Sequence, residues 1–235
     1  MNPKQKTILI TGNRKGIGRY LSEYYLEKGY NVVGCSRSSS DLSHKNYIHF
    51  LCDVKKEKEV KTTIRSIKKL NGGIDILINN AGKASLNHSI LTPSETVKDL
   101  FETNYLGSFL FSRECSKQMI KSKWGRIINF STIAVPLDLE GEMAYSCSKS
   151  AIEKMSRIMS KELSSYNITI NTIGPTPVYT DLIKVVPKDK VEEIINMQSI
   201  KRFGTFEDIS NVTDFFISNE SSFITGQKIY LGGLW

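Results

Sequence analysis

Short apolar runs alternate with longer amphipathic stretches along most of the chain. The runs are too short for helices, and several of them stop at glycine or polar residues, which is typical of buried strands. We expect strands at 7–11, 31–35, 47–51, 75–78, 126–130, 168–173 and 228–231. Helical patterns are predicted over 17–28, 55–70, 94–121 and 143–165, and two more helical stretches precede the last strand.

This alternation predicts an α/β fold, a doubly wound parallel sheet with helices on both faces. Right-handed crossovers place every strand-to-helix loop at the carboxyl edge of such a sheet, where ligands bind. The sequence contains no internal repeat, low-complexity segment or linker, so we predict a single domain over 1–235. Candidate functional residues are therefore expected to gather at one edge.

Composition narrows the class of protein. The chain is 40% hydrophobic and 24% charged, which is typical of a globular protein and excludes a disordered, collagen-like or coiled-coil chain. No apolar run approaches the roughly 18 residues of a membrane span, and the apolar stretch at the N-terminus is too short for a signal peptide. The four cysteines form no C-x-x-C pair and the three histidines lack ligand spacing. We expect a cytoplasmic protein without a bound metal.

The formal net charge of +8 permits binding to a polyanion. However, both signs of charge mix in segments such as 55–69, which is typical of a solvated helix face, so no nucleic-acid partner is expected. Lys121, Lys123 and Arg126 form a basic group that could contact an acidic carrier protein.

A glycine-rich loop follows the first predicted strand and begins the first helix. Glycines there let the backbone approach a phosphate closely, and the helix N-terminus faces that phosphate. The spacing is G-x-x-x-G-x-G rather than G-x-G-x-x-G, but its position predicts a dinucleotide site. Its members are Gly12, Asn13, Arg14, Lys15, Gly16, Ile17 and Gly18.

The end of the second strand indicates which dinucleotide is bound. Arg37, preceded by Ser36, lies about 20 residues after the glycine loop, where an acidic residue would select NAD and an arginine accommodates the 2′-phosphate of NADP. A guanidinium fork suits a phosphate dianion. We therefore predict NADP(H) as the cofactor.

Two Tyr-x-x-x-Lys pairs occur, and both place their side chains on one helix face. Tyr24 and Lys28 lie at the far end of the first helix and are predicted to be a surface pair. Tyr145 and Lys149 begin the helix after the fifth strand, at the predicted ligand edge. Thr132, just past that strand, is expected to meet the same helix.

The second pair has the residues that carbonyl reduction requires. Lowering a phenol pKa from about 10 to about 7 takes roughly 4 kcal/mol, which one ammonium about 4 Å away can supply. We expect Tyr145 to act as general acid and base, with Lys149 lowering its pKa and Thr132 donating a hydrogen bond to the substrate oxygen. Ser131 is the alternative hydroxyl donor, but its side chain is expected on the opposite face of the strand.

Taken together, these motifs resemble the short-chain dehydrogenase/reductase family over essentially the whole chain. Segments 79–82, 201–204 and 225–227 also match that family. The resemblance implies a Rossmann-type sheet of seven mostly parallel strands in the order 3-2-1-4-5-6-7, and Asn104 as a further active-site residue. It also implies cofactor contacts by Asp53, Val54, Asn80, Ala81, Gly82, Lys149, Pro175, Val178 and Thr180.

Three departures from the family pattern stand out. Thr132 occupies the position of the usual catalytic serine, and Thr176 follows Pro175 where a glycine is usual. The last residues, 231–235, lack the usual aspartate, which bears on subunit packing rather than chemistry.

The expected function is hydride transfer between NADP(H) and a small carbonyl or secondary alcohol, free or bound to a carrier. Reduction of a 3-oxoacyl group on an acyl carrier protein is the main alternative, and a non-catalytic cofactor-binding regulator is another. The substrate is expected between loops 83–95, 133–142 and 176–200, the last being a lid that includes Lys184, Lys188 and Lys190. Whether it is a ketone, a thioester, a sugar or a steroid-like alcohol stays open. The resemblance also implies a homodimer or homotetramer.

Overall fold

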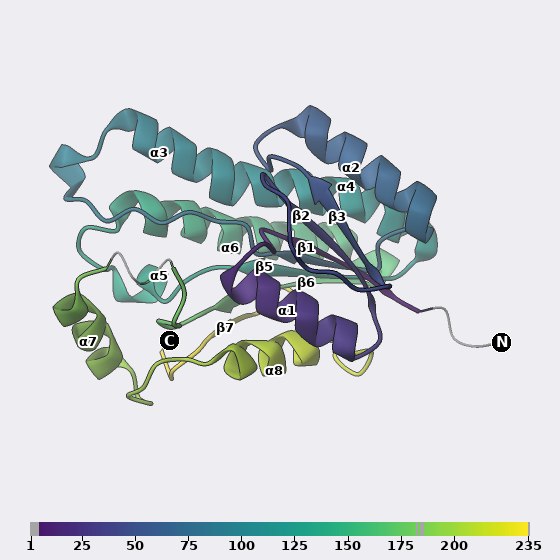
Figure 1. The fold of residues 1–235 in the computed structure, drawn as a ribbon. Helices are drawn as coiled ribbons and strands as arrows, with labels where there is room; N and C mark the ends of the chain where they lie inside the picture. The colour runs from purple at the N-terminus through teal and green to yellow at the C-terminus, as the bar shows by residue number, and fades with distance from the viewer. Residues whose placement is uncertain (1–4, 182, 184–185, 235) are drawn as a thin grey trace.

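The computed structural model describes residues 5–181, 183 and 186–234, and its centre is one parallel sheet of seven strands (Figure 1). The order is β3-β2-β1-β4-β5-β6-β7, so the predicted fold class and strand order are confirmed. The strands are β1 (Thr7–Thr11), β2 (Asn31–Ser36), β3 (Tyr47–Leu51), β4 (Ile76–Asn79), β5 (Gly125–Phe130), β6 (Ile168–Gly174) and β7 (Lys228–Tyr230).

Helices cover both faces of the sheet. Side chains of α2, α4 and α6 pack on one face, and those of α1 and α8 pack on the other (Figure 1). The helices are α1 (Gly16–Glu27), α2 (Glu57–Asn71), α3 (Ser94–Leu100), α4 (Gly107–Ser122), α5 (Ala134–Leu137), α6 (Met143–Leu163), α7 (Lys188–Met197) and α8 (Phe206–Ile217). Short 3₁₀ turns occupy Ser89–Leu91 (η1) and Ser164–Tyr166 (η3).

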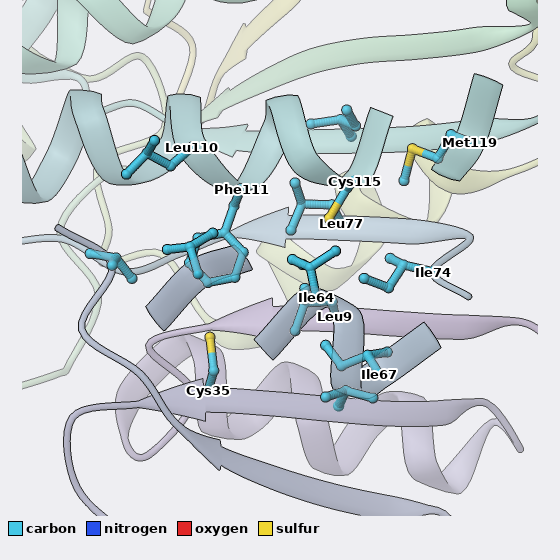
Figure 2. Close-up of a cluster of buried hydrophobic side chains, with 14 of the residues drawn as sticks. Leu9, Cys35, Ile64, Ile67, Ile74, Leu77, Leu110, Phe111, Cys115 and Met119 are labelled. Atoms are coloured by element: carbon cyan, nitrogen blue, oxygen red, sulfur yellow. The ribbon is translucent and has the colours of Figure 1, made fainter. Parts of the chain in front are cut away.

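Alternation along each strand divides the core into two layers. In β1, Leu9 points to the layer under α2 and α4, whereas Ile8 and Ile10 point to the layer under α1 and α8. Figure 2 shows the first layer, where Ile64 of α2 and Phe111 of α4 close over the sheet. Because both faces are covered, apolar residues occur on both sides of strands such as β1 (TILIT) and β4 (ILIN), which is why these strands appear as short apolar runs in the sequence.

The helical stretch predicted at 94–121 is interrupted. A π-helical turn, η2 (Phe101–Leu106), separates α3 from α4 and contains the buried Asn104. Single π turns inside helices are frequent at functional sites. Within the predicted lid at 176–200, Lys184 and Val185 lie outside the described residues, and α7 forms much of its second half.

One prediction about the surface is wrong. Arg126 is 1% exposed, because its guanidinium donates to the backbone oxygens of Gly125 and Ser218 and lies over the Trp124 ring. Lys121 and Lys123 are exposed, but they precede β5 and so lie at the edge of the sheet opposite the carboxyl ends of the strands. The three residues therefore do not form a basic surface near the ligand edge.

Candidate active site

A cleft of about 990 Å³ runs along the carboxyl edge of the sheet. Its walls come from the loops that follow β1 to β6, as the parallel topology requires. Most of the predicted site residues line it: Gly12, Arg14, Lys15, Gly16, Ile17, Ser36, Arg37, Asp53, Val54, Asn80, Ala81, Gly82, Thr132, Tyr145, Lys149, Pro175, Val178 and Thr180. Asn13, Gly18 and Asn104 lie behind this lining.

The glycine loop is packed too tightly for side chains at two positions. Gly12 has φ +68°, and a Cβ there would lie 2.7 Å from the Ala81 Cα. A Cβ on Gly18 would lie 2.6 Å from the Gly12 carbonyl oxygen. The loop therefore leaves its backbone and the N-terminus of α1 open toward the cleft, which is the arrangement that suits a phosphate.

Asn80 holds this loop to the end of β4. Its Nδ2 donates to the carbonyl oxygens of Thr11 and Gly12, each at 3.0 Å. In return, Thr11 Oγ1 accepts hydrogen bonds from the backbone N–H groups of Asn80 and Ala81 at 3.1 and 3.0 Å. Thr11 was not among the predicted site residues, because a threonine at a strand end carries no distinctive signal.

The Asn13 side chain turns away from the cleft. It is fully buried, and its Nδ2 donates to Ser22 Oγ at 3.2 Å and to Tyr47 Oη at 2.7 Å. Only the Asn13 backbone is therefore available to a ligand in the cleft.

Positive side chains gather at the β1–β2 end of the cleft. Arg14 and Arg37 are exposed there, and no ion pair of Arg37 occurs within the described part of the chain. Lys15 pairs with Asp181 at 2.7 Å. The guanidinium of Arg37 is thus free to meet an anionic group.

Tyr145 and Lys149 are carried by the first turns of α6 into the floor of the cleft, and both are buried. Burial raises the pKa of Tyr145 to about 12, and a hydrogen bond from the Thr132 hydroxyl offsets part of that rise. This differs from the expected lowering toward 7. The Lys149 ammonium donates to the Phe130 carbonyl oxygen at 2.8 Å, and burial lowers its pKa to about 8.

The strand end turns Thr132 and Ser131 to opposite sides. Thr132 lies beside Tyr145, and its Oγ1 accepts from the Ala134 N–H at 3.2 Å. Ser131 Oγ instead donates to the buried Glu153 carboxylate at 2.5 Å. Tyr230 and Lys228 of β7 reach the same carboxylate at 2.6 and 3.0 Å. Glu153, which sequence reasoning missed, lies four residues after Lys149 and so on the same helix face.

Asn104 connects the π-helical turn with α6. Its Nδ2 donates to Ser148 Oγ at 2.9 Å and to the Lys83 carbonyl oxygen at 3.0 Å, and its Oδ1 accepts from the Lys83 N–H at 2.8 Å. A Cβ on Gly82 would lie 3.3 Å from both Asn104 Oδ1 and Lys149 Nζ, so the two polar groups flank the same glycine.

The part of the cleft where the substrate is expected is lined largely by apolar side chains. Leu86, Leu139, Ile183, Val186 and Ile194 contribute to it. Glu142 also lines it, three residues before Tyr145. Burial raises the pKa of its carboxyl, and the charge of Lys190 offsets part of that rise.

Two candidate features are absent from the described residues. They hold no group of three or more His, Cys, Asp or Glu side chains that could bind a metal ion. Among the same residues, no helix combines the length and apolar character needed to cross a membrane.

Comparison with known proteins identifies relatives of this chain. Residues 6–191 match the short chain dehydrogenase family. The 3-oxoacyl-(acyl-carrier-protein) reductase FabG of Staphylococcus epidermidis is 29% identical over 238 residues, covering 97% of this chain and 98% of that protein. An NAD-dependent glycerol dehydrogenase of Listeria innocua is 30% identical over 239 residues, covering 99% and 94%.

Solved structures agree with the fold. The aldohexose dehydrogenase of Thermoplasma acidophilum superposes with a TM-score of 0.89 at 26% identity, covering 98% of this chain and 94% of that one. ElxO with NADP bound gives a TM-score of 0.89 at 26% identity, covering 97% of each chain.

Proposed function

The chain belongs to the short-chain dehydrogenase family of oxidoreductases, and from that premise we propose that it is an NADPH-dependent carbonyl reductase. The observation that carries the proposal is the convergence of Tyr145, Lys149 and Thr132 in one buried corner of the cleft. A proton donor, a cation and a hydroxyl thus lie within one site, and this is the set that a developing alkoxide needs.

The residues of the cleft fit a dinucleotide. The crowding around Gly12 and Gly18 keeps side chains out of the space before the N-terminus of α1, where a pyrophosphate would lie. Asp53, Val54 and Ala81 would line the adenosine part, while Pro175, Val178 and Thr180 would line the nicotinamide part. Once bound, the nicotinamide would supply the hydride.

Arg37 supports NADPH over NADH. Its guanidinium is exposed and unpaired among the described residues at the end of β2, and Arg14 adds a second cation nearby. The relatives differ on this point, since one is described as NAD-dependent and one structure contains NADP. The preference therefore rests on the residues of this chain.

The protonation states suit the direction of reduction. With a pKa of about 12, Tyr145 carries its proton at neutral pH and would donate it to the carbonyl oxygen. Lys149, with a pKa of about 8, is mostly charged at pH 7 and would stabilise the tyrosinate that remains. Thr132 would hold the substrate oxygen, and Asn104 would fix the start of α6 through Ser148.

A 3-oxoacyl group on a carrier protein is the second candidate substrate. The similarity to FabG favours it. However, Lys121 and Lys123, which could contact an acidic carrier protein, lie at the opposite edge of the sheet, and Arg126 is buried. The largely apolar lining where the substrate is expected favours a small uncharged carbonyl compound equally well.

The proposal is tested by binding and turnover. NADPH and NADH are titrated against the protein by fluorescence, and NADPH oxidation is then followed with ketones, aldoses and acetoacetyl thioesters. We expect tighter binding of NADPH and loss of that preference in Arg37→Asp, because a charge-assisted pair becomes a repulsion. Equal affinities for the two cofactors would refute the cofactor assignment, and no turnover with any carbonyl class would favour a regulatory role.

Assembly and location are also part of the proposal. Ile158 on α6 is 48% exposed and offers an apolar contact for a homodimer or homotetramer, which light scattering would measure. A cytoplasmic location follows from dependence on the intracellular NADPH pool.

A further inference from the structure

A continuous chain of hydrogen bonds joins the glycine loop to the segment that carries Arg37. Asn13 Nδ2 lies 2.7 Å from Tyr47 Oη, and Tyr47 Oη lies 2.9 Å from His49 Nδ1. His49 Nε2 then lies 3.1 Å from the Ser38 carbonyl oxygen and 3.2 Å from Ser36 Oγ. We call these five residues the Asn13–Ser38 relay.

The chemistry of the groups fixes the direction of every bond in the relay. A carbonyl oxygen only accepts, so the contact with Ser38 requires a proton on His49 Nε2. Burial lowers the pKa of His49, so the ring is neutral at pH 7 and Nδ1 is an acceptor. Tyr47 must therefore donate to Nδ1, and its oxygen accepts from Asn13 Nδ2. All the bonds point the same way, which favours mutual polarisation.

The relay is built into the sheet. Gly34 of β2 is the Cα partner of His49 on β3, and a Cβ on Gly34 would overlap the Asn13 carboxamide. Asn13 therefore crosses β2 only because residue 34 has no side chain. Neither Gly34 nor His49 had a role in the sequence analysis, because the parallel pairing that brings them together is a tertiary feature.

The relay ends directly beside Arg37. The Ser38 carbonyl oxygen accepts from two side chains, Ser36 Oγ at 2.6 Å and His49 Nε2 at 3.1 Å. Both neighbours of Arg37 are thus fixed, while the Arg37 side chain itself extends into the open end of the cleft.

We propose that His49 is a positioning residue for NADPH, setting the Ser36–Ser38 segment at the distance from the glycine loop that lets Arg37 meet the 2′-phosphate. The inference rests on the proposed use of NADPH and adds the residue that makes the Arg37 contact effective. A ligand that carries both a pyrophosphate and a 2′-phosphate must match two loops at once, and a preformed spacing removes the cost of ordering one of these loops on binding.

Two substitutions of His49 distinguish the hydrogen bond of ring nitrogen Nε2 from that of Nδ1. In His49→Gln, the amide NH₂ reaches the position of Nε2 and can still donate to the Ser38 carbonyl oxygen. In His49→Asn, the shorter side chain reaches only the position of Nδ1, so the bond to Tyr47 is retained and the bond to Ser38 is lost. The pair is matched in polarity and in the absence of charge.

The probes are 2′,5′-ADP and 5′-AMP, which differ by the 2′-phosphate, with affinities measured by calorimetry. We expect His49→Asn to bind 2′,5′-ADP about tenfold more weakly and 5′-AMP unchanged, in line with one lost hydrogen bond. His49→Gln should retain the parent's ratio of the two affinities. Arg37→Ala is the reference for complete loss of the 2′-phosphate contact, and thermal unfolding of each free variant checks that it is folded.

The outcomes separate this inference from the cofactor proposal. If the parent prefers 2′,5′-ADP and Arg37→Ala abolishes the preference, the cofactor proposal stands. An unchanged ratio in His49→Asn would then overturn the role of His49 alone. An equal loss of affinity for both ligands in His49→Asn would also overturn the proposed role, because His49 would then only stabilise the fold. A parent that does not distinguish the two ligands would refute both proposals together.

Discussion

The end of α1 and the start of α6 carry the same Tyr-x-x-x-Lys spacing in opposite surroundings. Tyr24 donates to Asp214 Oδ2 at 2.6 Å, and Lys28 pairs with the same carboxylate at 2.5 Å and lies over the Tyr24 ring. Tyr145 and Lys149 are buried and meet a threonine hydroxyl and a backbone carbonyl instead of a carboxylate.

The surroundings shift the pKa values of Lys28 and Lys149 in opposite directions. Hydrogen bonding to Asp214 and Tyr24 raises the pKa of Lys28, whose side chain is 44% exposed. Burial lowers the pKa of Lys149 to about 8. The comparison teaches that the spacing places both side chains on one helix face, while burial and the neighbouring charges decide in which direction the pKa values of the pair shift.

The largest expected effect comes from the two tyrosines. Tyr145→Phe removes only the phenolic oxygen and should lower kcat about a thousandfold, because the general acid is lost, while NADPH binding stays nearly unchanged. Tyr24→Phe makes the same change in the surface pair and should leave kcat as it is. Steady-state kinetics and fluorescence titration measure both variants, and full activity in Tyr145→Phe would remove the basis of the comparison.

Thr132 should give the next largest effect. Thr132→Val removes the hydroxyl beside Tyr145 and should lower kcat about a hundredfold, as loss of one donor to a developing oxyanion does. Thr132→Ser should retain most of the activity.

Ser131→Ala is the matched control for position 132. It breaks the bond to Glu153 on the other side of the strand end, so it should cost stability in urea rather than turnover. An inactive Ser131→Ala together with an active Thr132→Val would transfer the hydroxyl role to Ser131.

The dependence of kcat/KM on pH should report the protonation of Lys149. Because Lys149 loses its proton as the pH rises through about 8, kcat/KM for reduction should fall above that pH by about tenfold per unit. Tyr145 stays protonated over this range and adds no second limb. In Lys149→Arg the limb should move to higher pH, since a guanidinium keeps its charge. If kcat/KM of this variant still falls above the same pH, the fall is due to the titration of another group.

The smallest effect on activity should come from Asp214→Ala, which removes the acceptor shared by Tyr24, Tyr25 and Lys28. We expect unchanged kcat and a loss of about 1–3 kcal/mol in the free energy of unfolding, because the buried Tyr25 hydroxyl is left without a partner. Urea denaturation measures the loss. A large fall in kcat would mean that the α1 pair is coupled to the site.

Much of the fold was accessible from the pattern of residues. The strand predicted at 47–51 matches β3, and the glycine loop lies between β1 and α1 as expected. The prediction of one continuous helix over 94–121 failed at η2, because nothing distinctive in the residues of that stretch marks a π turn. The exposure expected for Arg126 was wrong because a charged residue at the start of a strand is usually exposed, whereas here the Trp124 ring and the Ser218 carbonyl oxygen help to cover it.

The sequence by itself determined the strand–helix alternation, the parallel sheet and the edge at which Gly12, Arg37, Tyr145 and Lys149 would meet, because periodicity and the handedness of crossovers are local properties. Tertiary structure alone decided which way the Tyr145 pKa moves and which partners hold Ser131 and His49. These depend on the desolvation and hydrogen bonds that distant segments supply, so no single stretch of sequence contains them.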